Sequence, residues 1–165
     1  MICHECNSNM KESQEVYHYT ESGLDNVYLG NICIHRCKCG ESFPSIPNII
    51  ELNTVIGSLV VKKSTSLDGK EIVFLRKNVG LNAKTFAEYL GIDKSTLSRW
   101  ENNQQKIAKS NDRFIRLIYA NLKGLSGEDI DNLLKGAAKD FNKSKYGEKI
   151  NIPMDSICSQ IECRT

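Results

Sequence analysis

The spacing of apolar residues predicts helices over most of the chain beyond residue 47. Apolar side chains recur three and four positions apart between 48 and 61, which places them on one face of a helix: Ile49, Leu52, Val55, Ile56, Leu59 and Val60. The same spacing returns in five later segments, which begin after Asp68, Asn82, Asp93, Asn111-Asp112 and Ser126. In the segment that opens at Asn111-Asp112, the expected apolar stripe is Phe114, Leu117, Ile118, Ala120 and Leu122.

The first 43 residues follow a different pattern, with short runs of β-branched and aromatic residues. Two such runs cover 16–20 and 27–29, and Ser22-Gly23 between them favours a turn. Pro44 and Pro47 follow, and we expect the chain to bend there. Near the other end of the chain, residues 149–152 alternate like a strand.

These patterns predict an α+β fold, with a small strand-rich N-terminal domain followed by an all-α domain of five helices. We place the strand-rich domain at 1–46 and a connecting helix and linker at 47–66. The helical domain then covers 67–142, and a C-terminal extension covers 143–165.

Residues 82–101 are typical of two short helices joined by a tight turn. A small residue, Ala87, lets the second helix approach the first, and Gly91 supplies the positive φ that the turn needs. Leu97 then returns to the shared core. This pattern predicts a helix-turn-helix that binds DNA, and an ordinary helical hairpin is the alternative.

The second helix of this unit would present polar side chains on its outer face. They are able to meet phosphates and base edges in a major groove: Lys94, Ser95, Thr96, Ser98 and Arg99. Charge agrees with this hypothesis, because residues 67–123 hold eleven basic and six acidic residues while the whole chain carries only +2. A solvated charged surface is the other interpretation of the same charge.

Seven cysteines are too many to be incidental in a reducing compartment, where they favour metal over disulfides. Cys3 and Cys6 form a Cys-x2-Cys pair, and Cys37 and Cys39 form a second pair followed by Gly40. We expect these four thiolates to bind a structural zinc ion, which would supply folding energy to a region too small to fold alone. Cys33 and His35 are rival ligands, because spacing alone does not choose among them.

A redox dithiol and inert buried cysteines are the alternatives to zinc. The redox hypothesis is disfavoured because no strand precedes the first pair, as a thioredoxin-like site would require. Cys158 and Cys163 are expected to be core residues or free thiols. All-cysteine ligation would leave zinc no open position for catalysis, and no phosphate-binding loop or hydrolase signature is present. We therefore expect the protein not to be an enzyme.

No stretch is long and apolar enough to span a membrane, and the N-terminus has no signal-peptide pattern. The sequence therefore predicts a cytoplasmic protein without membrane contact.

Residues 67–123 resemble the Cro/repressor-type (Xre) helix-turn-helix family, on Ile72-x2-Leu75-Arg76, Phe86-Ala87-x2-Leu90-Gly91 and Leu97-Ser98-Arg99-Trp100-Glu101. The resemblance implies that the helix after Asp93 is the recognition helix and that Lys94, Ser95 and Arg99 face DNA. It also implies that Lys84 and Thr85 face a phosphate. We expect Lys106 to bind phosphate as well.

The order of the two modules, over residues 1–123, resembles the MqsA/YgiT family of zinc-finger helix-turn-helix proteins. The resemblance rests on Cys3-x2-Cys6, Cys37-x-Cys39-Gly40-Glu41 and the Xre motifs above. It implies a repressor that dimerises and binds a palindromic operator, and for several members an antitoxin that binds a ribonuclease toxin. The chain departs from the family in its Cys-x-Cys pair and in its longer C-terminal end.

Our hypothesis from the sequence is a sequence-specific repressor that binds operator DNA as a homodimer. Two alternatives belong to other classes. One is a protein-binding module, such as an antitoxin, that acts mainly through its zinc domain. The other is a redox sensor in which cysteine oxidation expels zinc, with Cys33 beside the cluster.

Overall fold

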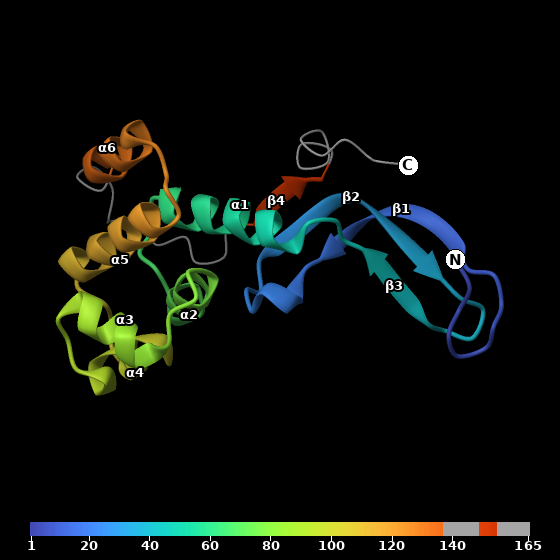
Figure 1. Cartoon of the computed structure of the whole chain (residues 1–165), viewed down its shortest axis with the longest axis horizontal. Helices are drawn as coiled ribbons and strands as arrows, with labels where there is room; N and C mark the ends of the chain where they lie inside the picture. The colour runs from blue at the N-terminus through green and yellow to red at the C-terminus, as the bar shows by residue number, and fades with distance from the viewer. Residues whose placement is uncertain (137–148, 155–165) are drawn as a thin grey trace.

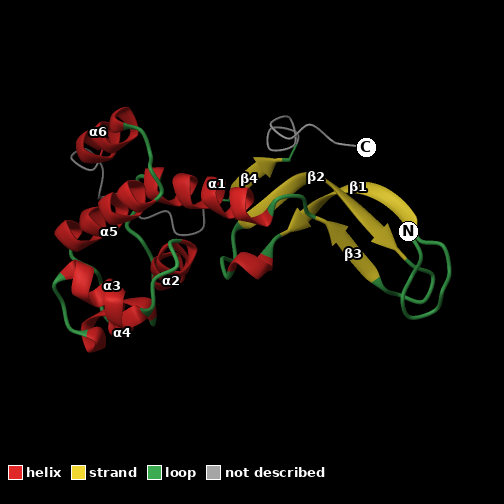
Figure 2. Ribbon diagram, in the orientation of Figure 1, coloured by secondary structure: helices red, strands yellow, loops and turns green. Residues whose placement is uncertain are grey.

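The computed structural model describes residues 1–136 and 149–154. Strands gather at one end of the molecule and helices at the other, with helix α1 (Ile49–Lys62) running between them (Figure 1). Figure 2 shows the same separation by secondary structure. The α+β fold predicted from the sequence is therefore confirmed. None of the helices in the described part of the chain is long and apolar enough to cross a membrane.

The sheet has four strands arranged around β2 (Val27–Arg36). Strand β1 (Lys11–His18) pairs with β2 in antiparallel orientation. Two short strands share the opposite edge of β2. Strand β3 (Ser42–Ser45) pairs antiparallel with the C-terminal half of β2, and β4 (Ile150–Pro153) pairs parallel with the N-terminal half of β2. The expected strand at 149–152 thus exists, and it returns the chain from the helical end to the sheet (Figure 1).

Two local predictions about the strands are corrected. The first strand begins at Lys11 rather than at Val16, and a bulge between Glu15 and Tyr17 leaves Val16 exposed. Pro44 does not bend the chain, because it lies inside β3 opposite Ile34. A proline is tolerated there because β3 is an edge strand, where a backbone N–H is not required on the outer side.

The helices follow α1 in the order α2 (Gly69–Asn78), α3 (Ala83–Leu90), α4 (Lys94–Glu101), α5 (Lys109–Leu122) and α6 (Gly127–Gly136). Several begin at the residues that the sequence indicated. Asn48 and Asn82 accept a hydrogen bond from the N–H three residues later, and Asp68 forms a capping box with Glu71.

Helix α5 differs from the prediction in its start and in its buried face. It begins at Lys109 rather than at Asn111-Asp112. Phe114 and Leu122 are each 43% exposed, and the buried face carries Asp112, Ile115, Arg116, Tyr119 and Ala120. Two charged residues lie on this buried face because they bind each other, with Arg116 Nε 2.8 Å from Asp112 Oδ2. A pattern of apolar spacing does not detect such a pair.

One continuous hydrophobic core links the sheet to the helices. Sheet residues such as Val27 and Leu29 pack in the same cluster as Leu52 and Ile56 of α1 and Leu97 of α4. Helix α1 also approaches α5 closely, since a Cβ on Gly57 would lie 1.9 Å from the hydroxyl oxygen of Tyr119. The core therefore fixes α1 against both ends of the molecule. Residues 137–148 and 155–165, which include Cys158 and Cys163, lie outside the described residues.

Candidate nucleic-acid interface and four-cysteine cluster

The turn between α3 and α4 has the geometry that the sequence predicted. Helix α3 ends at Gly91, which adopts a φ of +65°, and the backbone N–H of Ile92 returns to the carbonyl oxygen of Ala87. Ala87 and Leu97 are almost completely buried. The two helices therefore meet through small and aliphatic side chains, as a helix-turn-helix requires.

The C-terminal end of α4 is fixed by contacts with α2. Trp100 is 4% exposed, and Glu101 accepts two hydrogen bonds from Arg76, with Nε 2.7 Å from Oε1. Arg76 also donates to the carbonyl oxygen of Leu81. Because both charged groups are nearly buried, this bidentate pair holds α4 in one orientation.

A second tether joins the same two helices through the backbone. The N–H of Gly69 donates to Asn103 Oδ1 at 2.8 Å, just beyond the end of α4. A Cβ on Gly69 would lie 2.3 Å from the carbonyl oxygen of Glu101, so the backbones of α2 and α4 touch at this point. Helix α4 is thus held against α2 by both side-chain and backbone contacts.

The face of α4 opposite these contacts is polar and open. The residues that the sequence proposed for DNA contact all lie on α3, α4 or the loop after α4, and six are exposed: Lys84, Lys94, Ser95, Ser98, Arg99 and Lys106. Thr85 and Thr96 are half-buried. Ser98 also accepts a hydrogen bond from Asn102 Nδ2 through its carbonyl oxygen, at 2.8 Å.

The loop after α4 adds polar residues that the sequence reasoning did not select. Gln104 and Gln105 are exposed, and both of their backbone N–H groups donate to the carbonyl oxygen of Arg99. These hydrogen bonds place the backbone of both residues beside the end of α4. The polar run from 102 to 106 is the signal that would have found them.

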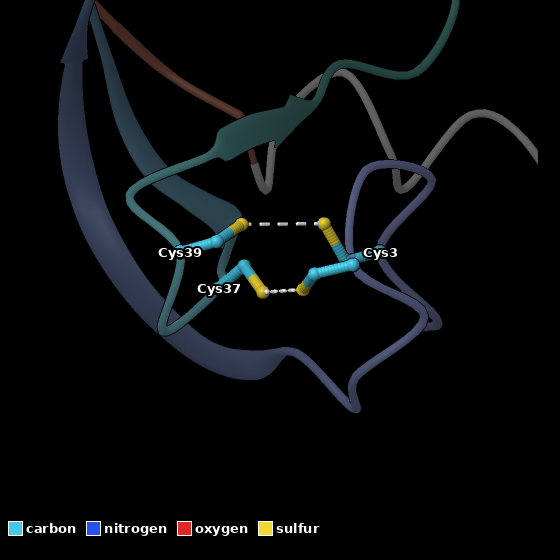
Figure 3. A group of neighbouring side chains, drawn as sticks. Cys3, Cys37 and Cys39 are labelled. Carbon is cyan, nitrogen blue, oxygen red and sulfur yellow. Dashed lines mark hydrogen bonds between the residues drawn. The ribbon is translucent and has the colours of Figure 1, made fainter.

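Two tight turns bring four cysteines together at the far end of the sheet. In the first turn Cys3 N–H donates to Ser8 and Asn7 N–H donates to Cys3. In the second, which follows β2, Gly40 adopts a φ of +103° and donates its N–H to Cys37. Figure 3 shows Cys3 facing Cys37 and Cys39 across the two turns.

The four sulfur atoms lie within 4.8 Å of one another. Cys3 Sγ is 3.7 Å from Cys39 Sγ, and Cys6 Sγ is 3.2 Å from Cys37 Sγ. Both separations far exceed the roughly 2.05 Å of a disulfide bond, and all four cysteines are free thiols. The structure thus brings together the four cysteines that the sequence assigned to one cluster.

The four thiols influence one another's protonation. Hydrogen bonds from the side chain of Ser8 and then from Cys37 lower the pKa of Cys6 to about 6. For Cys37, a backbone hydrogen bond at Cys39 lowers the pKa, but the hydrogen bond with Cys6 and burial outweigh it and raise the pKa to about 12. The thiolate form of Cys6 is therefore stabilised by the Ser8 hydroxyl and by the neighbouring Cys37 thiol.

Cys33 and His35 do not belong to this cluster. They lie within β2, which ends at Arg36, whereas Cys37 and Cys39 lie in the turn that follows. The spacing left Cys33 and His35 as rival ligands, and the end of β2 at Arg36 separates them from the four clustered cysteines. Cys33 and His35 instead lie close to Glu12 of β1. Sequence reasoning missed Glu12, because only the register of β1 against β2 places it there.

Comparison with known proteins identifies one part of the chain. The Helix-turn-helix family model matches residues 74–117, which run from within α2 to within α5. This match supports an Xre-type helix-turn-helix domain. This is a family of DNA-binding regulatory domains, so the chain carries the DNA-binding domain of a regulator. No curated protein and no solved structure matches the chain.

Proposed function

We propose that this protein is a transcriptional repressor that binds a palindromic operator as a homodimer, with α4 as its recognition helix. The observation that carries the proposal is the exposed polar face of α4, held in one orientation by the buried Trp100 and the Arg76–Glu101 pair. A recognition helix must be rigid and polar on its outer side in order to read bases in a major groove.

In this proposal Arg99 donates to the O6 and N7 acceptors of a guanine, and Ser95 contacts a neighbouring base. The two residues lie four positions apart and therefore share one face of α4. Lys84, Thr85, Lys94 and Lys106 bind phosphates around this face, and Thr96 and Ser98 complete the polar surface. One helix reads too few bases for an operator, so a second copy would read a half-site about one helical turn away.

The first experiment is selection of bound sequences from a random DNA pool by the full chain. The expected product is an inverted repeat with half-sites about 10 base pairs apart. Failure to enrich any sequence would contradict sequence-specific binding. A single half-site without symmetry would contradict the dimer.

Two variants then separate base reading from phosphate binding. Arg99→Ala is expected to cost about 1–3 kcal/mol on the selected operator and to relax specificity at one base pair. Lys84→Ala is expected to weaken all sequences alike and to reduce the salt slope by about 1. Lys11→Ala is the matched control, because Lys11 is exposed on β1, far from α4. Equal effects of the three variants on operator affinity would refute the proposed contacts of α3 and α4 with DNA.

The four-cysteine cluster fits a zinc ion. In tetrahedral zinc with Zn–S bonds of about 2.3 Å, sulfur atoms lie about 3.8 Å apart. Cys3 Sγ and Cys39 Sγ are 3.7 Å apart, and Cys6 Sγ and Cys37 Sγ, 3.2 Å apart, would separate slightly to bind the ion. Zinc would crosslink the two turns and so stabilise the end of the sheet. The test is metal content per chain. Cys39→Ser should lose one equivalent that wild type retains, and Lys11→Ala, an exposed position on β1 outside the cluster, should retain it.

A protein partner such as a toxin is a second candidate, as in the MqsA/YgiT-type antitoxins that the module order resembles. It is supported by apolar side chains exposed at the strand-rich end, where Met1 and Ile2 are 56% and 60% exposed and Val16 is 69% exposed. Co-expression with the product of the adjacent gene tests it. A stable complex that Val16→Asp abolishes, with DNA binding unchanged, would support this role, and no complex would contradict it.

A further inference from the structure

A second group of metal-ligating side chains lies on the sheet, away from the four cysteines. Glu12 of β1 is directly opposite His35 of β2, and Cys33 is two residues before His35 on the same strand. Side chains two apart on a strand share a face, so Cys33 and His35 point to the same side of the sheet. One ligand atom from each of the three residues lies within 4.8 Å of the others.

The imidazole of His35 is arranged between the other two groups. Its Nδ1 is 3.3 Å from Glu12 Oε1, and its Nε2 is 3.9 Å from Cys33 Sγ. Nδ1 is buried, yet no group among the described residues makes a hydrogen bond with it. The carboxylate of Glu12 approaches Nδ1 without hydrogen-bond geometry, so this nitrogen lacks the partner that a buried polar atom normally has.

A metal ion bound through Nδ1 would supply that partner. Because one ion takes only one nitrogen of an imidazole, the thiolate of Cys33, which lies 3.9 Å from Nε2, would turn toward Nδ1 to bind the same ion. Nitrogen and oxygen ligands at about 2.0–2.1 Å from tetrahedral zinc are separated by about 3.3 Å, and this is the distance between Nδ1 and Oε1. A thiolate, an imidazole and a carboxylate together suit zinc or cobalt, whereas magnesium and calcium prefer oxygen ligands alone. The side chain of Glu12 is 59% exposed and can move onto an ion without leaving a packed position.

We propose that Glu12, Cys33 and His35 form a second site for a zinc-class divalent cation. Three protein ligands leave one coordination position for water or another small ligand, whereas the four-cysteine cluster would leave none. The ion at this site is therefore expected to bind more weakly and to exchange faster than an ion held by four thiolates. This proposal is independent of DNA binding.

The test is a titration of the full chain with Co²⁺, after metal removal under reducing conditions, with bound metal measured per chain. Wild type should bind two equivalents, and a mild chelator should remove one of them first. Cys33→Ser and His35→Ala should each lose that equivalent. Glu12→Gln should raise the Kd for this second Co²⁺ ion by about tenfold or more. His18→Ala is the control, because His18 lies on β1 outside both groups.

The two metal sites fail separately in this experiment. Cys39→Ser should lose the tightly held equivalent and keep the one that depends on Cys33. If wild type binds a single equivalent that Cys39→Ser abolishes, the second site does not exist. Retention of both equivalents by Cys33→Ser/His35→Ala, with an unchanged far-UV circular dichroism spectrum, would overturn the proposal as well.

Discussion

Replacement of Arg116 by alanine should be among the most damaging single changes in this protein. The side chain of Arg116 is 7% exposed, and its guanidinium binds Asp112, whose side chain is fully buried. It also donates to the carbonyl oxygens of Val61, Lys63 and Thr65, at 2.8, 2.7 and 2.6 Å. The segment between α1 and α2, expected from its sequence to be a linker, is therefore fastened to α5.

The cost follows from what remains after the guanidinium is removed. Asp112 would keep its hydrogen bond from the N–H of Leu67, at 2.6 Å, but it would lose its only cationic partner among the described residues. Removing one member of a buried ion pair typically costs about 3–5 kcal/mol. For a chain of this size about 1 kcal/mol lowers Tm by about 2–4 °C, so Arg116→Ala should lower Tm by about 6–20 °C.

The measurement is urea or thermal unfolding followed by circular dichroism. Lys135→Ala is the matched control, because Lys135 and Asp131 also form an ion pair four residues apart, but both side chains are more than half exposed. Such an exposed pair contributes about 0.3–0.5 kcal/mol. Arg116→Ala/Asp112→Ala should cost less than the sum of the two single changes. Similar losses for Arg116→Ala and Lys135→Ala would refute the reasoning.

Three further predictions follow from other contacts. Gly69→Ala should lower the free energy of unfolding by about 1–3 kcal/mol, because the new Cβ would meet backbone atoms of α4. Gly127→Ala is the control, since no atom lies within 4 Å of its Cβ, and equal melting temperatures for the two variants would contradict the close contact. Arg76→Ala should cost about 1.5–3 kcal/mol and weaken operator binding, because Glu101 loses its bidentate partner; unchanged operator binding would show that this pair does not position α4. Chelation of zinc should expose the thiols of the four-cysteine cluster to a thiol reagent and leave the helix-turn-helix folded; protection of those thiols without metal would refute the zinc proposal.

The helix boundaries were predictable where a single local interaction defines them. Asn48, Asp68 and Asn82 each cap a helix through a backbone N–H three residues later. Gly91 ends α3 because it accepts the positive φ that other residues avoid. The start of α5 was wrong because its N-cap, Ala108, makes no side-chain hydrogen bond and so leaves no polar signal in the sequence.

The buried face of α5 was not predictable from apolar spacing. Ile115 and Tyr119 are buried, but the residues that share their face are Asp112 and Arg116, which suggest a solvent-exposed side when considered alone. Burial of these charges is tolerated because each satisfies the other and because Arg116 also binds three carbonyl oxygens. The three carbonyl oxygens belong to residues about fifty positions earlier in the chain, so the spacing of residues within α5 does not reveal these contacts.

The sequence by itself determined the features that depend on neighbours within a few positions: the capped helices, the turn at Gly91 and the two cysteine pairs. The tertiary structure alone decided how distant segments combine. The register of β1 on β2 placed Glu12 beside His35, and the end of β2 at Arg36 separated Cys33 from Cys37. The tertiary structure also placed β4, from near the other end of the chain, at the edge of β2. The physical reason is that local interactions are fixed by chain geometry, whereas strand register and buried ion pairs are chosen by the packing of the whole core.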